Sequence, residues 1–205
     1  PIHSSAASDV YKRQVRLLRE VGLARLNQGG IQAAQAALME AVTIDGPGVM
    51  LHRAVALGSL GSTHEAARDW ATAAETFARG ARLAGELGAY GLQAMLLAYQ
   101  ATNTYYGLGQ EEAGLRLLAC AKGLLARPGF PLKKAFVHHN IAMFDLECGR
   151  YGSAIFHLRS AVALMEMLGE HIDAQLFSCQ LALALRLDGD DTASDAVLDL
   201  SLIHI

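Results

Sequence analysis

A short pattern of small and aromatic residues recurs about every 40 positions along this chain of 205 residues. The clearest copy is GRYGSAIFHLRSAVAL at residues 149–164, where an aromatic residue follows the glycine and small residues recur seven positions apart. The equivalent small residue of each copy is Ala34, Ala73, Gly114, Ala154 or Ser194, so successive copies are 39, 41, 40 and 40 residues apart. Such a period is typical of a repeat protein, in which neighbouring units bury apolar faces that no unit can bury alone.

A second apolar stretch precedes each copy, at residues 15–26, 53–66, 94–108, 135–148 and 174–187. Each unit therefore reads as a helix A, a tight turn and a helix B. The small residues are needed where the two helices cross, because a larger side chain would hold their backbones apart. Glycines at positions 29, 109, 149 and 189 follow helix A, where a left-handed residue commonly ends a helix. The sequence predicts an all-α repeat fold.

Composition agrees with this prediction and excludes several classes of function. Hydrophobic residues make up 52% of the chain but aromatic residues only 6%, so Ala and Leu dominate, as in close helix packing. A net charge of −3 gives no electrostatic case for nucleic-acid binding, and no apolar run reaches the roughly 18–20 residues of a membrane span. Cys120, Cys148 and Cys179 are isolated, so we expect small buried residues in a reducing, cytoplasmic setting.

Residues 15–199 resemble the tetratricopeptide repeat family. The pairs Val21-Gly22, Leu60-Gly61 and Ile141-Ala142 match helix A of that repeat, and the small–aromatic–small pattern matches helix B. The period is longer than the family's usual length of about 34 residues. The family's helix A tryptophan is replaced by Leu18, Leu57, Ala98, His138 and Ser178.

The resemblance implies a right-handed α–α superhelix of about four and a half repeats, acting as a non-catalytic scaffold for a protein or peptide partner. Lengthened repeats also look like the sensor or oligomerisation arms of large bacterial signalling and transcription regulators, such as cyclases and ATP-dependent activators. We keep that role as an alternative.

In such repeat proteins the A helices line a concave groove, whose exposed positions meet a partner. By repeat phase these positions are Arg16, Arg19, Asn27, Tyr99, Asn103, Tyr106, Phe136, His139, Met143, Glu147 and Arg186. Tyr, Met and Arg are enriched in interface cores, which favours this interpretation. The alternative is that Tyr99, Phe136 and Met143 only pack between neighbouring helices.

Signals for catalysis, cofactors or metals are weak throughout. The adjacent His138 and His139 point about 100° apart on a helix, and no third ligand stands at metal spacing on the same face. HEAAR at residues 64–68 lacks the second histidine of HExxH, and GLGQEEAG at 107–114 lacks phosphate-loop spacing. Acidic residues at the starts of B helices suit helix capping. We expect no catalytic residue, cofactor or metal site.

The two ends of the sequence match each other as DNA. One codon choice for DVYKRQ, residues 9–14, is GATGTGTATAAGAGACAG, whose reverse complement translates as the strand-like LSLIHI of residues 200–205. This resembles the transposon end used in sequencing-library preparation. We therefore expect residues 1–14 and 200–205 to be non-native and residues 15–199 to be a fragment of a longer reading frame. The last B helix is then incomplete, so we also expect self-association through residues 172–187.

Overall fold

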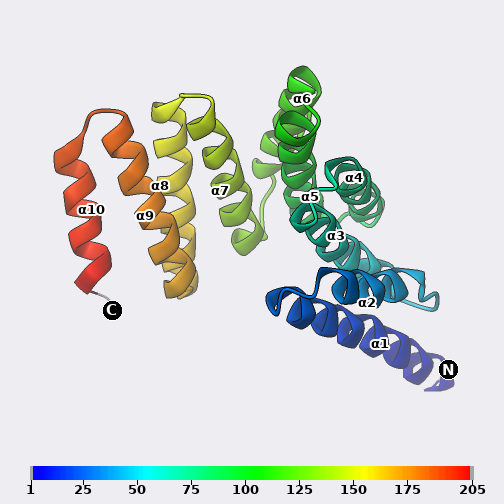
Figure 1. Cartoon of the computed structure of the whole chain (residues 1–205). Helices are drawn as coiled ribbons and strands as arrows, with labels where there is room; N and C mark the ends of the chain where they lie inside the picture. Colours follow the sequence, from blue (N-terminus) through cyan, green and yellow to red (C-terminus); the bar gives the residue numbers. More distant parts are fainter. Residues whose placement is uncertain (1, 204–205) are drawn as a thin grey trace. The chain divides into compact units, whose positions relative to one another are not determined.

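The computed structural model describes the backbone of residues 2–203 and the side chains of residues 8–199. Within this range the chain is all helical, without strands, which confirms the predicted fold class. Five pairs of helices alternate A and B as expected (Figure 1). The pairs are α1 (Ile2–Asn27) with α2 (Ile31–Thr43), α3 (Met50–Ala66) with α4 (Trp70–Glu86), α5 (Tyr90–Thr102) with α6 (Glu111–Leu125), α7 (Pro131–Glu147) with α8 (Tyr151–Leu168), and α9 (His171–Leu187) with α10 (Asp191–Ile203). A π-helical turn, η1 (Asn103–Gly107), extends α5.

The helices group into two compact units, Pro1–Leu124 and Leu125–Ile205. The first unit holds three helix pairs and the second holds two. Within the second unit, α7, α8, α9 and α10 lie side by side in chain order (Figure 1). Each unit has its own buried apolar clusters, built mainly from Ala and Leu.

The small residues that carry the repeat lie where the helices meet. All five are buried: Ala34, Ala73, Gly114, Ala154 and Ser194. Gly61 on α3 shows why size matters, because a Cβ atom there would stand 2.6 Å from the Phe77 ring of α4. The small residues are therefore packing positions, as predicted.

The turns after α1, α3, α7 and α9 share one hydrogen-bonded geometry. After α7, the amide of Gly149 donates to the carbonyl of Leu146 at 3.0 Å, and the amide of Arg150 donates to Asp145 at 2.8 Å. These two bonds close a Schellman motif around a left-handed residue, here with a φ of 68°. The predicted glycines fill this position after α1, α7 and α9. Gly109 after η1 is also left-handed, but there the amide of Gln110 donates to the carbonyl of Thr104. After α3 the position is held by Arg68, which has a φ of 59° without being glycine.

The terminal segments continue the first and last helices. Residues 2–14 belong to α1, and residues 200–203 extend α10 as helix rather than strand. The last repeat thus consists of α9 and the 13-residue α10, of which residues 191–199 lie in the stretch expected to be native. Residues 1, 204 and 205 lie outside the described residues, and the adapter origin of both ends stays a prediction.

Candidate partner-binding surface

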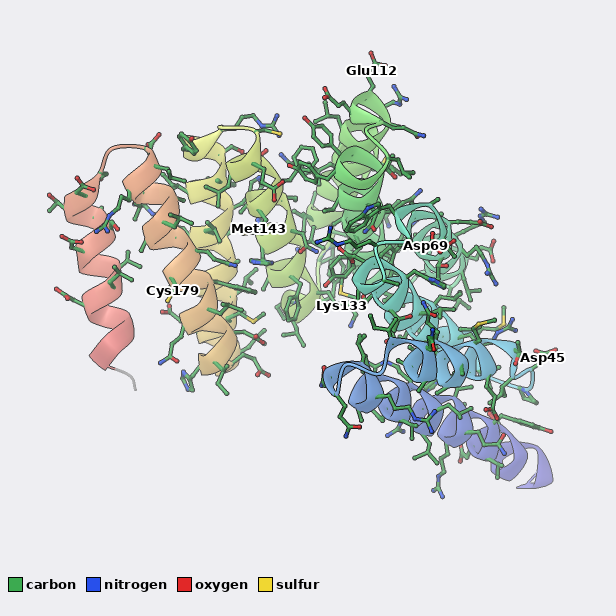
Figure 2. The ribbon with its side chains drawn as sticks, in the orientation of Figure 1. Asp45, Asp69, Glu112, Lys133, Met143 and Cys179 are labelled. Carbon is green, nitrogen blue, oxygen red and sulfur yellow. The ribbon has the colours of Figure 1, made fainter. Side chains whose placement is uncertain are left out.

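Three predicted groove residues of the second unit lie on α7, where they pack toward neighbouring helices. Phe136 meets the ring of Phe177 on α9 edge to face, with centroids 6.0 Å apart. His139 stacks on the same ring, with centroids 4.4 Å apart. Met143, labelled in Figure 2, is half-buried against the apolar cluster between α7 and α9. Only Glu147, at the end of α7, is exposed.

His139 sits among polar side chains from two helices. Burial lowers the pKa of His139, and the amides of Gln180 and Asn140 and the charge of Asp173 partly oppose this effect. Among the described residues, Nε2 of His139, Nδ2 of Asn140 and Oε1 of Gln180 have no well-aligned hydrogen-bond partner. The imidazole is therefore held neutral in an environment suited to contacts with other neutral groups.

Predicted groove residues of the first unit begin on α1. Arg16 and Asn27 are exposed. Arg19 is half-buried, because its Nε donates to Oγ of Ser59 on α3 at 3.1 Å while its Nη1 pairs with Glu20 at 2.5 Å. Of these two arginines, Arg16 has the guanidinium group that is more accessible to an acidic partner.

The remaining predicted residues of the first unit lie on α5 and η1. Tyr99 stacks on Phe77 of α4, with ring centroids 5.3 Å apart. Asn103 is only 1% exposed and donates from Nδ2 to the backbone carbonyl of Tyr99 at 2.9 Å. The prediction that Asn103 faces a partner is therefore wrong, because the side chain is buried and bonds to the backbone of the preceding helical turn. Tyr106 is exposed and lies edge-on to Tyr105.

Asn103 also contacts a half-buried carboxyl group on α3, that of Glu65. Burial raises the pKa of Glu65, and a hydrogen bond with Asn103 partly opposes that rise. Oδ1 of Asn103 is itself without a partner among the described residues. This polar pair links α3 to η1 inside the first unit.

Arg186, the last predicted groove residue, already pairs with the neighbouring helix. Its Nη2 lies 2.7 Å from Asp195 and its Nε lies 3.5 Å from Asp191, both on α10. All three side chains are more than half exposed, so these ion pairs contribute little free energy. A carboxylate partner would compete with two aspartates for this guanidinium group.

The groove assignment did not include an exposed apolar row along α9, which lies within residues 172–187, the stretch expected to self-associate. We call this row the α9 stripe. Its members are Ile172, Leu176, Cys179, Leu183 and Leu187. Leu176 is 53% exposed and Leu183 is 52% exposed, although both are leucines in the middle of a helix. Spacings of three and four residues along a helix place all five on one face, and that signal was available in the sequence.

The cysteine prediction fails at the same helix. Cys179 on α9, labelled in Figure 2, and Cys120 on α6 are exposed, and Cys148 is half-buried. Isolated cysteines are often buried, but these occupy outer helix positions that the repeat leaves uncovered.

A shallow hollow of about 380 Å³ lies beside α5 and α6 in the first unit. Its lining mixes amide, hydroxyl and guanidinium groups with apolar ones, from Gln100, Thr104, Gln110, Ala113, Arg116, Leu117 and Cys120. Nothing in the sequence pattern pointed to it, because its polar members come from both a helix and a turn.

A metal site is not formed by the described residues, which contain no group of three His, Cys, Asp or Glu side chains that could hold an ion. His138 instead faces His157 of α8, with their Nδ1 atoms 2.9 Å apart. Across the described residues, every helix is too short or too polar to cross a membrane.

The arrangement of helix pairs matches solved structures of repeat proteins. BtubC (BKLC) from P. vanneervenii is 16% identical, with a TM-score of 0.66 over 96% of this chain and 89% of that one. The TPR-like repeats of a Podosopora anserina protein described as a putative kinesin light chain are 19% identical, with a TM-score of 0.62 over 94% and 95% of the two chains. A second crystal structure of those repeats, from a substituted form, gives a TM-score of 0.64 over 94% of each chain.

The fold is TPR-like. These identities establish the fold alone. No protein-family model matches the sequence. No curated protein matches it either.

Proposed function

We propose that this TPR-like chain is a non-catalytic protein-binding scaffold, and that its A helices provide the binding surface. The α9 stripe carries the proposal, because contiguous exposed apolar side chains mark sites of protein–protein contact. The half-buried Phe136 and His139 on α7 lie beside α9 through Phe177, so the surface extends over two A helices of the second unit.

The chemistry of this surface indicates an apolar partner rather than a highly charged one. Leucine side chains supply area without directional bonds, and His139 is neutral because burial lowers its pKa. The fitting partner is an amphipathic helix, whose apolar residues recur at three and four positions and match the stripe. In the first unit, Arg16, Asn27 and Tyr106 are the accessible groove residues that could make secondary contacts.

The exposed thiols support a reducing location. Cys120 and Cys179 are accessible and unbridged, a state that persists in the cytoplasm but not in oxidising compartments. The alternative role is an oligomerisation or sensor arm of a larger regulator. That role would use the same α9 stripe, but the stripe would bind another part of the regulator or a second copy rather than a separate protein.

A displayed library of amphipathic helical peptides tests the proposal. Peptides selected on the whole chain should bind wild type and lose at least about tenfold in affinity to Leu176→Glu, since a buried charge opposes apolar contact. The matched control is Phe156→Glu, which changes an exposed apolar residue on the B helix α8 and should bind as wild type does. If both variants bind equally well, the A-helix surface is not the binding site.

A further inference from the structure

Two A helices each leave one apolar-containing face uncovered. On α9 this face is the α9 stripe. On α1 it is a row around Leu17, which is 66% exposed, and we call it the α1 face. Its members in the stretch expected to be native are Leu17, Glu20 and Ala24, and the same row continues through Val10 and Arg13 of the N-terminal segment.

The contact between consecutive A helices recurs in both units. In the second unit, Phe177 of α9 packs against Phe136 and His139 of α7, and Gln180 lies beside His139. In the first unit, Arg19 of α1 bonds to Ser59 of α3. Arg19 and His139 occupy the same repeat position, as do Ser59 and Gln180. The same pair of positions thus forms the contact twice.

The two uncovered faces contain the repeat positions that form this contact elsewhere, but no A helix of the described part of the chain covers them here. The repeat positions of Phe136 and His139, 40 residues further on, are Leu176 and Cys179 on the α9 stripe. The repeat position of Phe177, in the first repeat, is Leu17 on the α1 face. Leu17, Leu176 and Cys179 are apolar or small, and each of them is exposed.

We propose that the chain assembles head to tail, with the α9 stripe of one molecule packed on the α1 face of a second copy. Leu17 of the second copy would take the place beside Leu176 and Cys179 that Phe177 takes beside Phe136 and His139. The contact is heterologous, so each molecule offers one face from each of its two units and the assembly can extend. This inference rests on the proposed function only in using the same surface of α9.

Charge favours this pairing over the pairing of two α9 stripes. From residue 15 onward, helix α1 contains three arginines and one acidic residue, so its positive charge does not depend on the segment expected to be non-native. Helix α10, which flanks the stripe, contains three aspartates and no basic residue. A head-to-tail contact brings opposite charges together, whereas two α9 stripes facing each other would bring two acidic helices together. The second copy is therefore the occupant that these faces fit.

Two blocking variants of the full chain test the geometry. Leu17→Glu blocks the α1 face and Leu176→Glu blocks the α9 stripe, and both residues are exposed, so folding should be unchanged by circular dichroism. In sedimentation velocity over a concentration series, wild type should associate, while each variant alone should stay monomeric. An equimolar mixture should form a dimer that grows no further, since it retains one intact face of each kind. Phe156→Glu should associate as wild type does.

Each other result overturns the proposal. Wild type that stays monomeric at the highest concentration excludes the assembly. Association that survives Leu17→Glu but not Leu176→Glu indicates paired α9 stripes instead. Peptide binding separates this inference from the proposed function, because Leu17→Glu should abolish association and leave peptides bound to α9.

A disulfide trap tests the register of the contact. Glu20 holds the repeat position of Gln180, so in the assembly it should lie beside Cys179 of the neighbouring molecule, as Gln180 lies beside His139. In a chain with Cys120 and Cys148 changed to Ser, Glu20→Cys should give an intermolecular disulfide on mild oxidation. The control Glu40→Cys, exposed on α2, should give none. Equal cross-linking of the two variants would contradict the register.

Discussion

Arg68 offers the most direct test of how the turns end the A helices. It occupies the left-handed position of the Schellman motif after α3, with a φ of 59°, and its amide donates to the carbonyl of Glu65 at 2.9 Å. The next amide, that of Asp69, donates to His64 at 2.9 Å. Arg68→Gly keeps both backbone hydrogen bonds and removes the Cβ atom that disfavours this conformation.

The expected gain follows from two opposing contributions. A left-handed conformation costs a residue with a Cβ atom roughly 1–2 kcal/mol. Glycine loses more chain entropy on folding, which offsets roughly 0.5–1 kcal/mol of that relief. Arg68→Gly should therefore raise the free energy of unfolding by about 0.5–1 kcal/mol. The reverse change, Gly29→Ala, meets no atom within 4 Å and should lower it by a similar amount.

Urea unfolding followed by the fluorescence of Trp70 suits this test, because the single tryptophan begins α4 two residues after Arg68. Arg68→Ala is the control, since it removes the exposed side chain but keeps the Cβ atom, and it should unfold as wild type does. If Arg68→Gly is no more stable than Arg68→Ala, the strain assigned to this turn is absent and the reasoning is wrong.

Three further predictions probe the interior, and one of them uses an exposed glycine as its control. Glu65→Gln should stabilise the chain at neutral pH, because burial raises the pKa of this carboxyl group and its charged form opposes folding. The gain in the free energy of unfolding, measured by urea titration, should shrink as the pH falls through the raised pKa. Gly61→Ala should lower the free energy of unfolding by about 1–3 kcal/mol, since its Cβ would stand 2.6 Å from a ring atom of Phe77. Its control is Gly123→Ala, whose Cβ meets nothing within 4 Å, and which should stabilise α6 by about 0.5–1 kcal/mol in the same urea titration. Burial lowers the pKa of His139, so this residue contributes fully to stability above the ordinary histidine pKa of 6.5, and its contribution declines as the pH falls below that value. His139→Gln should therefore make the free energy of unfolding less dependent on pH in this range. An unchanged dependence on pH would refute the assignment.

The fold could be predicted from the sequence because the repeat period follows the packing of the helices. A small residue every 40 positions marks each crossing of an A and a B helix, and Ala34, Ala73, Ala154 and Ser194 are buried there. The glycines predicted the left-handed turns for a similar reason, since few other residues adopt that conformation. These features depend on local geometry that is the same in every repeat.

The candidate site was less predictable, because a repeat period shows which residues are equivalent but not which face of a helix meets a partner. The groove positions assigned by phase include Phe136 and His139, which the next A helix partly covers, and Asn103, which the π-helical turn buries. The exposure of Leu176 depends on what packs beside α9. That is a property of neighbouring helices rather than of the local sequence.

The placement of the thiols has a practical consequence. Cys120 belongs to the first compact unit and Cys179 to the second, and both are exposed while Cys148 is half-buried. With Cys148 changed to Ser, a spin label or a dye pair can be attached to one native position in each unit. Pulsed electron resonance or single-molecule energy transfer would then report the distance between the units and its spread, in a chain carrying only one substitution.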